Sequence, residues 1–354
     1  MCLSVLSRFY GSKQSHCTSD TKGMISADLP ILMLILAQTG IGIVGNALLF
    51  CHYICSLFRR HVLRPLKQII NHLALANTLV LLCGGIPQTM AAFGMKFFLD
   101  DVGCKLVFYF QRVAWGSSLS ITCLFGSFQA LYINPTNSRW EELKFKSPKY
   151  VNSSCILSWI FHLLVNIIVP MRVTGQENSR NSSVKSNLGH CSRVFINTIT
   201  ETMYSVIFSS VDVICLGLMI WASGSMIFFL HRHKQQVQYI HSTRKSPQIS
   251  PETRATKFIL ILVSTFVLFY SLSSAFETCV YLFDNPPLWL VNTKMLLASC
   301  FPTLSPFLLL KSDKHISSLC SFCWGSCRTY PMFVQYLFIR HLTLWSNFCV
   351  RHML

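Results

Sequence analysis

The chain has 354 residues, of which 52% are hydrophobic and only 12% are charged. Soluble domains carry about 25% charged residues, so the composition excludes an ordinary soluble domain and indicates a membrane protein. The formal net charge of +17 does not indicate a nucleic-acid partner. The Lys and Arg residues lie between apolar runs and are not gathered in one tail.

Seven apolar runs follow one another along the chain, and about 20 apolar residues are enough for a helix to cross a bilayer. They cover residues 30–57, 68–92, 105–133, 151–170, 202–230, 256–283 and 289–310. We therefore predict an all-α membrane protein, a seven-transmembrane helix bundle at 30–310. In the second run, Gly84, Gly85 and Pro87 predict a kink, because proline removes a backbone donor.

Basic residues predict the orientation of the bundle, because short cytoplasmic connections are enriched in Lys and Arg. They gather after the first, third and fifth runs, whereas the connection after the second run holds only Lys96. The connection after the fourth run is also basic, but long loops translocate with little regard to charge. We expect an extracellular N-terminal segment at 1–29 and a cytoplasmic tail at 311–354.

This orientation makes predictions about two kinds of residue in the extracellular layer. Asn181 lies in a glycosylation sequon of the fourth-to-fifth connection and is expected to be modified, whereas the sequon at Asn152 falls at the cytoplasmic side. Cys104 and Cys191 both fall in the oxidising layer and are expected to form a disulfide. The alternative is that both thiols are free. Cys2 and Cys17 also lie in the segment expected to be extracellular, so they are competing disulfide partners.

Local strings through all seven runs resemble the vomeronasal type-1 receptors, a family of G-protein-coupled pheromone receptors. The strings are "LALANTLVLLCGGIPQTMAAFG" (73–94), "GCKLVFYFQRV" (103–113), "CLFGSFQALYINP" (123–135), "WASGSMIFFLHRHKQQVQ" (221–238) and "ASCFPTLSPFLLL" (298–310). The resemblance implies a plasma-membrane receptor for a small molecule, coupled to a heterotrimeric G protein of the inhibitory class, with no enzymatic activity and no cofactor. A small-molecule transporter and a retinal photoreceptor, the latter because of Lys294, are the alternatives.

Two positions depart from the pattern of rhodopsin-like receptors, and a third departs from that of many vomeronasal relatives. Asn77 stands where those receptors carry a buried Asp, so we expect no sodium site. Gln129, in Phe128-Gln129-Ala130, stands where they carry the Arg of Asp-Arg-Tyr, so the usual ionic lock is not expected. Many vomeronasal relatives have an Arg at the place of Trp115, and the aromatic ring is expected to change ligand preference.

Ionisable residues inside the spans are candidates for the ligand pocket, because such residues usually face the bundle interior. Arg112 lies about 12 Å below the outer end of its run, at 1.5 Å per residue, and Glu277 lies at a similar depth in the sixth. We expect these two to face each other across an outward-opening cavity that is also lined by Lys294, Gln88, Gln111 and Trp115. The alternative is an ion pair that only packs the bundle. Asp212 is a further candidate, with the hydroxyls of Ser209 and Ser210 as alternative partners.

The cytoplasmic face is expected to dock the G protein through Gln129, Arg232, Lys234 and Arg254. Attraction to anionic lipid would also account for these basic residues. After the last run, Cys320, Cys323 and Cys327 fit reversible acylation better than a zinc site, which would need a fourth ligand; ordinary thiols are the alternative. The run 332–350 contains Arg340 and His341 and is expected to lie on the membrane.

Overall fold

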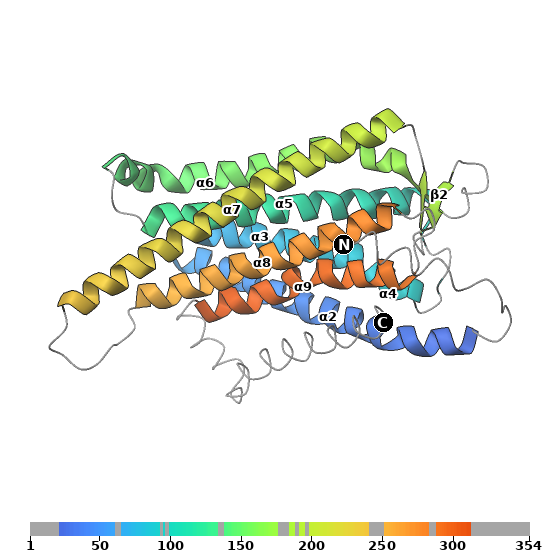
Figure 1. Ribbon diagram of the computed structural model, residues 1–354, viewed down its shortest axis with the longest axis horizontal. Coiled ribbons are helices and arrows are strands. Elements are labelled where there is room, and N and C mark those ends of the chain that lie inside the picture. Colours follow the sequence, from blue (N-terminus) through green and yellow to red (C-terminus); the bar gives the residue numbers. More distant parts are fainter. Residues whose placement is uncertain are drawn as a thin grey trace, which may run out of the picture.

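The structure is a computed structural model that describes residues 21–60, 65–92, 95, 99–133, 138–175, 184–187, 191–194, 198–240, 251–282 and 288–312. Its helices run side by side along one long axis, and a small sheet covers one end of the bundle, called here the sheet end (Figure 1). The helices are α2 (Thr21–Arg60), α3 (Pro65–Val80), α4 (Ile86–Ala92), α5 (Asp101–Ile133), α6 (Ser138–Val165), α7 (Thr198–Ile240), α8 (Pro251–Leu282) and α9 (Leu288–Ser312).

The predicted seven-helix membrane bundle is confirmed, since each apolar run forms a helical stretch of membrane length. Within the described residues, 6 of these stretches are long and apolar enough to cross a membrane. The remaining stretch, α5, has 33 residues but is more polar. This polarity suits its central position, because α5 packs against α3, α6 and α7, and among its described side chains only Val102, Leu106 and Phe110 are exposed.

The second span is interrupted where the sequence predicts a kink. A π-helical turn, η1 (Leu81–Gly85), joins α3 to α4, and π-turns within helices are frequent at functional sites. A Cβ atom on Gly85 would collide with Oγ1 of Thr39, and one on Gly84 would lie 2.7 Å from Nε2 of Gln111. The two glycines therefore let this turn approach both α2 and α5.

Proline in α9 explains how α2 is attached to the bundle. Pro306 has no N–H, so the carbonyl of Pro302 loses its helical donor. Asn46 replaces that donor, because its Nδ2 lies 2.9 Å from the Pro302 oxygen and 2.8 Å from the Gly42 oxygen. A Cβ atom on Gly45 would lie 3.2 Å from Pro306 and from Phe307, so Gly45 allows the two helices to come this close.

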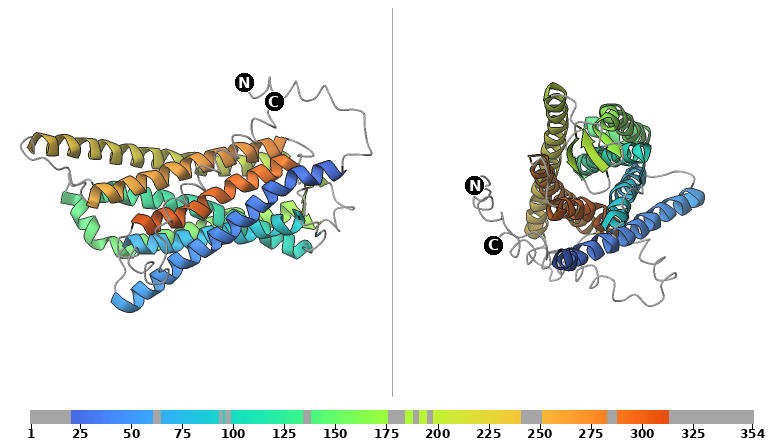
Figure 2. Two further views of the ribbon diagram at one scale, coloured as in Figure 1. Left: turned by 90° about the horizontal axis from the view of Figure 1, so that it is seen from below. Right: turned by 90° about the vertical axis from the view of Figure 1, so that its right-hand side faces the viewer.

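The distribution of polar side chains is the reverse of that in a soluble protein. Asn77, Ser117 and Thr122 are buried, whereas large apolar side chains such as Leu157 and Phe228 are exposed. The outer flanks of α6 and α7 are the most exposed, while α9 is the most enclosed of the spans. The right view of Figure 2 shows the helices arranged around a common interior, and the left view shows α2 crossing the others obliquely. This pattern is typical of a bundle whose solvent is lipid.

The sheet lies in the connection between α6 and α7, for which the sequence predicts only a long loop. After α6, a short 3-10 helix, η2 (Asn166–Arg172), leads into β1 (Val173–Gly175). Strands β2 (Val184–Asn187) and β3 (Cys191–Val194) follow, and the strand order is β1-β3-β2 with antiparallel pairing. In the β1–β3 register, Gly175 lies opposite Cys191 and Val173 lies opposite Arg193.

Candidate functional site

Two separate attachments hold the sheet to the beginning of α5. The first is a disulfide between Cys104 in α5 and Cys191 in β3, the two cysteines that the sequence places in one layer. Both are fully buried, and Val173, Leu99 and Phe108 pack around them. The disulfide therefore joins β3 directly to the first turn of α5.

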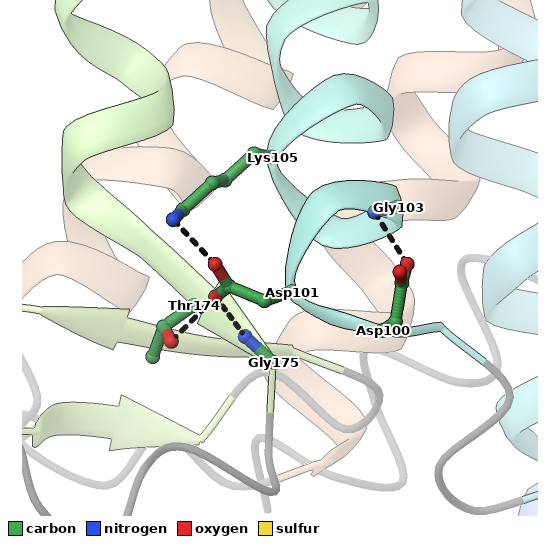
Figure 3. Close-up of polar contacts among 6 residues, drawn as sticks. All are labelled: Asp100, Asp101, Gly103, Lys105, Thr174 and Gly175. Carbon is green, nitrogen blue, oxygen red and sulfur yellow. Dashed lines mark hydrogen bonds and ion pairs between the residues drawn. The ribbon is translucent and has the colours of Figure 1, made fainter.

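The second attachment is the carboxylate of Asp101, which faces β1 (Figure 3). The Thr174 hydroxyl donates to Oδ1 of Asp101 at 2.8 Å, and the Gly175 N–H donates to the same atom at 3.1 Å. Lys105, one turn along α5, forms an ion pair with Oδ2. The hydrogen bond from Lys105, together with those from Thr174 and Gly175, holds the pKa of Asp101 below its usual range, although partial burial acts against them.

The neighbouring acid has a different role, although the two lie side by side in the sequence. Oδ1 of Asp100 accepts the Gly103 N–H at 2.7 Å and so caps the beginning of α5. Figure 3 shows Asp100 turned away from the strand that Asp101 contacts. A Cβ atom on Gly175 would lie 3.1 Å from the Asp101 nitrogen and 3.3 Å from the Asp100 carbonyl carbon. Glycine at 175 therefore permits this close approach between β1 and the start of α5.

Glu277 pairs directly with Lys294, and Arg112 is a more distant neighbour. The ion pair joins α8 to α9, and its side chains are 22% exposed for Lys294 and 40% for Glu277. The charge of Arg112 acts on Glu277 as well, and so does that of Arg193 on β3. That Arg112 and Glu277 face each other across a cavity stays a prediction, whereas Lys294, predicted only as a pocket residue, is the direct partner of Glu277.

The predicted glutamines, Gln88 and Gln111, both contact α9. Nε2 of Gln88, in α4, lies 2.6 Å from Oδ1 of Asn292 in α9. Nε2 of Gln111 lies 3.8 Å from the Met295 sulfur. Both glutamines thus connect α9 to its neighbours.

A small cavity lies between α5, α6, α7 and α8, and two of the predicted pocket residues, Arg112 and Trp115, line it. Its free volume is about 10 Å³, and the remaining lining residues are Gly116, Phe161, His162, Val165, Val211, Asp212 and Tyr270. Lys294, Glu277, Gln88 and Gln111 do not line this cavity. The polar side chains of the predicted site are therefore divided between two groups, one around this cavity and one beside α9.

Asp212 connects α7 to α8, and its hydrogen-bond partner is Tyr270 rather than Ser209 or Ser210 of its own helix. The Tyr270 hydroxyl donates to Oδ1 of Asp212 at 2.7 Å. The Trp115 ring stacks on Tyr270, with ring centroids 5.2 Å apart. Arg112 acts electrostatically on Asp212. Trp115 therefore packs against Tyr270, whose hydroxyl binds the carboxylate of Asp212.

His162 and Tyr270 are polar residues of the cavity lining that the sequence analysis did not single out. His162 is 2% exposed, and its Nε2 lies 2.8 Å from the Ser120 hydroxyl oxygen. Nδ1 is buried and has no hydrogen-bond partner within the described residues. A histidine inside the fourth apolar run was the available signal, because polar groups are costly at such a position.

A neutral hydrogen-bond network fills the place where rhodopsin-like receptors carry a buried carboxylate. Nδ2 of Asn77 donates to the Ser305 hydroxyl at 2.9 Å, and the Ser118 hydroxyl donates to Oδ1 of Asn77 at 2.9 Å. Asn77, Ser118 and Ser305 are all buried. One amide therefore joins α3, α5 and α9 with its donor and its acceptor both in use.

Several predicted positions lie at or beyond the limits of the described residues. At the end opposite the sheet, Gln129 is buried and Arg232 is exposed. Lys234 and Arg254 lie in α7 and α8, but their side chains are outside the described residues. Asn181, the cysteines at 320, 323 and 327, and the run 332–350 are also outside them.

Comparison with known proteins identifies the family to which this arrangement belongs. The profile of the vomeronasal organ pheromone receptor family matches residues 30–322. The chain belongs to this vomeronasal receptor family. It is 48% identical over 299 residues to vomeronasal type-1 receptor 1 of Gorilla gorilla gorilla, covering 84% of each chain. It is 49% identical over 291 residues to vomeronasal type-1 receptor 4 of Homo sapiens, covering 82% of this chain and 96% of the relative.

More distant similarities extend the comparison to fish and to solved structures. The chain is 31% identical over 284 residues to olfactory receptor class A-like protein 1 of Danio rerio, covering 80% of this chain and 89% of that one. Its fold matches the crystal structure of squid rhodopsin with a TM-score of 0.63 and 13% identity, over 88% of this chain and 87% of that one. The chain is therefore a chemosensory receptor of the vomeronasal family with the fold of a G-protein-coupled receptor, a multi-pass membrane protein suited to the plasma membrane.

Proposed function

We propose that this vomeronasal receptor binds a small, pheromone-like molecule in the half of the bundle nearer the sheet and activates a heterotrimeric G protein at the opposite end. One observation carries this proposal. Arg112 and Asp212 line one cavity inside a membrane bundle, and Glu277 and Lys294 form an ion pair between two of its helices. Ionisable groups are costly within membrane spans and usually mark a functional site. The G protein is proposed to be of the inhibitory class, because of the family resemblance.

The proposed orientation places the sheet outside the cell. A disulfide persists in an oxidising compartment, and Cys104–Cys191 lies at the sheet end. Residues 1–29 are then an extracellular segment with the bundle at 30–310, and residues 311–354 are a cytoplasmic tail. Glycosylation of Asn181, and acylation of the cysteines in the tail, belong to the same proposal.

Ligand binding is proposed to act through the contact between α7 and α8. The Tyr270–Asp212 hydrogen bond links these helices beside the cavity, and a ligand that engages Asp212 or Arg112 changes the stability of this link. A ligand shifts a conformational equilibrium only by binding its two states differently. The signal then reaches Gln129, Arg232, Lys234 and Arg254, the proposed contacts of the G protein.

The pocket is tested by ligand-evoked G-protein activation in cells, with receptor variants compared at matched surface expression. Arg112→Met removes the charge and is expected to abolish the response to an active compound found by screening, whereas Arg112→Lys is expected to keep part of it. Phe110→Ala is the matched control, because Phe110 is 41% exposed on the same helix. A normal response of the Arg112→Met receptor would reject the ligand pocket.

Docking of the G protein needs a separate measurement. Arg232→Ala is expected to reduce activation of the G protein while the compound still binds to purified receptor, because Arg232 lies far along α7 from the cavity. Equal loss of both binding and activation would instead show that the variant disturbs the whole bundle.

A further inference from the structure

The cavity beside His162 has the chemical character of a site for one small polar group. Among the described residues, it brings together a buried ring nitrogen that has no partner, one carboxylate and one guanidinium. A buried polar atom without a partner costs about 1–3 kcal/mol relative to a satisfied one. His162 is held there in spite of this cost, so a ligand atom that bonds to Nδ1 would remove the penalty.

The position of the His162 ring is set by its neighbours. Ser120, on α5, binds Nε2 at 2.8 Å, and Gly116 leaves space beneath the ring. A Cβ atom on Gly116 would collide with Nδ1 and would lie 2.6 Å from Cε1. The packing of Gly116 and the bond to Ser120 together fix the ring beside the cavity that Gly116 and His162 both line, with Nδ1 against Gly116.

The charge balance of the lining indicates which chemical class fits. One guanidinium, of Arg112, and one carboxylate, of Asp212, line the cavity, so their formal charges cancel. Neither a cation nor an anion is favoured, because each would be repelled by one of the two groups. A neutral dipolar group can interact with both.

The imidazole of His162 further restricts the chemical class of ligand group that fits the cavity. If Nε2 accepts a hydrogen bond from the Ser120 hydroxyl, then Nδ1 carries the hydrogen and donates; if Nε2–H donates to Ser120, then Nδ1 accepts. A hydroxyl is matched to both tautomers, whereas an ether or a ketone oxygen only accepts. The free volume of about 10 Å³ is close to the space that one water molecule requires, so a single hydroxyl is the largest group that enters without rearrangement.

We propose that this cavity is a hydroxyl-binding subsite, in which one neutral hydroxyl bonds to Nδ1 of His162 and interacts with Arg112 and Asp212. The hydroxyl is that of an alcohol ligand when one is bound and of a water molecule otherwise. The proposal rests on the receptor function proposed above and adds the functional group that the receptor reads. Its two sources are distinguished by the experiments.

The water is tested on wild-type, full-length receptor in lipid nanodiscs by electron cryomicroscopy without added compound. Density for one ordered oxygen within hydrogen-bond distance of Nδ1 is expected. Density that leaves Nδ1 bonded to a protein group, or leaves the cavity unfilled, would overturn the proposal. This arm needs no substitution, so it does not depend on the folding of a variant.

The alcohol is tested by thermal unfolding of the same preparation with three probes of one chain length: a medium-chain alkanol, its methyl ether and the alkane. The alkanol is expected to bind about tenfold more tightly than the ether or alkane, the factor for one hydrogen bond. This preference is expected to disappear in His162→Leu and to persist in His162→Gln, whose amide donates and accepts. Leu164→Ala, at a position that is 64% exposed on the same helix, controls for general effects on α6.

Equal stabilisation by the three probes, including none by any of them, would overturn the alcohol subsite, and so would a preference that His162→Leu retains. Failure of the receptor proposal has a different signature. It would appear as an absence of G-protein activation in cells, which the unfolding measurement does not require. A wild-type receptor that signals but does not distinguish alkanol from ether would reject the subsite alone.

Discussion

Replacing Asp101 by Ala is expected to detach β1 from α5 while the disulfide keeps β3 in place. The substitution removes the acceptor of both the Thr174 hydroxyl and the Gly175 N–H, and it removes the partner of Lys105. The Cys104–Cys191 bond involves neither β1 nor the Asp101 side chain. The effect should therefore be confined to β1 and its junction with α5.

The size of the effect follows from the contacts that are lost. Hydrogen bonds to charged groups contribute about 1.5–3 kcal/mol each, but the Asp101 side chain is 27% exposed, so we take about 1 kcal/mol for each. The partly exposed pair with Lys105 adds about 0.2–1 kcal/mol. Local opening of β1 should become easier by about 2–3 kcal/mol, which corresponds to a roughly 30- to 100-fold loss of amide protection, at 1.4 kcal/mol per tenfold.

Amide hydrogen exchange of the purified, full-length receptor measures this quantity directly in peptides that cover residues 173–175. Asp101→Asn retains an acceptor oxygen and loses only the charge, so about a fivefold loss is expected, on the order of 1 kcal/mol. Asp100→Ala is the matched control, because Asp100 caps α5 through Gly103 and does not contact β1.

Two results would refute this reasoning. One is unchanged protection of residues 173–175 in Asp101→Ala, which would mean that the disulfide alone holds the sheet. The other is an equal loss in Asp100→Ala and Asp101→Ala, which would mean that fraying of α5 is responsible and that the contact with β1 contributes nothing.

Three further predictions concern charge and polarity elsewhere. The pKa of Asp101 is lowered in the folded protein, so its contribution to stability is complete above the unfolded pKa of about 3.9 and is lost as the pH falls through the folded pKa. Amide protection of β1, corrected for intrinsic exchange, should therefore decrease only below about pH 4. In Asp101→Asn, this pH-dependent decrease should be absent. Glu277→Lys is expected to lower the midpoint temperature of thermal unfolding, and the double variant Glu277→Lys, Lys294→Glu is expected to restore it. A double variant that unfolds at the same temperature as Glu277→Lys would argue against a pairwise contact. Asn77→Leu should cost about 1–3 kcal/mol by leaving two serine hydroxyls unpaired, and an unchanged unfolding temperature would contradict this.

The seven spans were predictable because the thickness of a bilayer sets the length of each apolar run. The same physics indicated that Arg112 faces the bundle interior, where it lines the cavity, since an arginine in such a run has few other places to lie. The pairing of Glu277 with Lys294 was not predictable in detail. Depth along the helices indicated Arg112 as the residue facing Glu277, whereas the structure pairs Glu277 with Lys294, because the rotation of each helix about its axis decides which side chains meet.

His162 and Asp101 show what kind of information the sequence lacks. In the sequence, His162 is one polar residue in an apolar run, and only its packing against Gly116 and Ser120 of another helix places its ring beside a cavity. Asp101 is an acid in a polar connection. Its role depends on Thr174 and Gly175, more than 70 residues away along the chain.

Composition, run lengths and local strings were thus enough to establish a seven-helix receptor of this family, because lipid imposes its constraint on each span separately. The partners of the buried polar groups depended on the packing of the helices, because a hydrogen bond joins atoms that only the rotation and tilt of neighbouring helices bring together. The small sheet and its attachment to Asp101 also depended on the tertiary structure, since strands pair between separate segments and the sequence of one segment does not specify its partner.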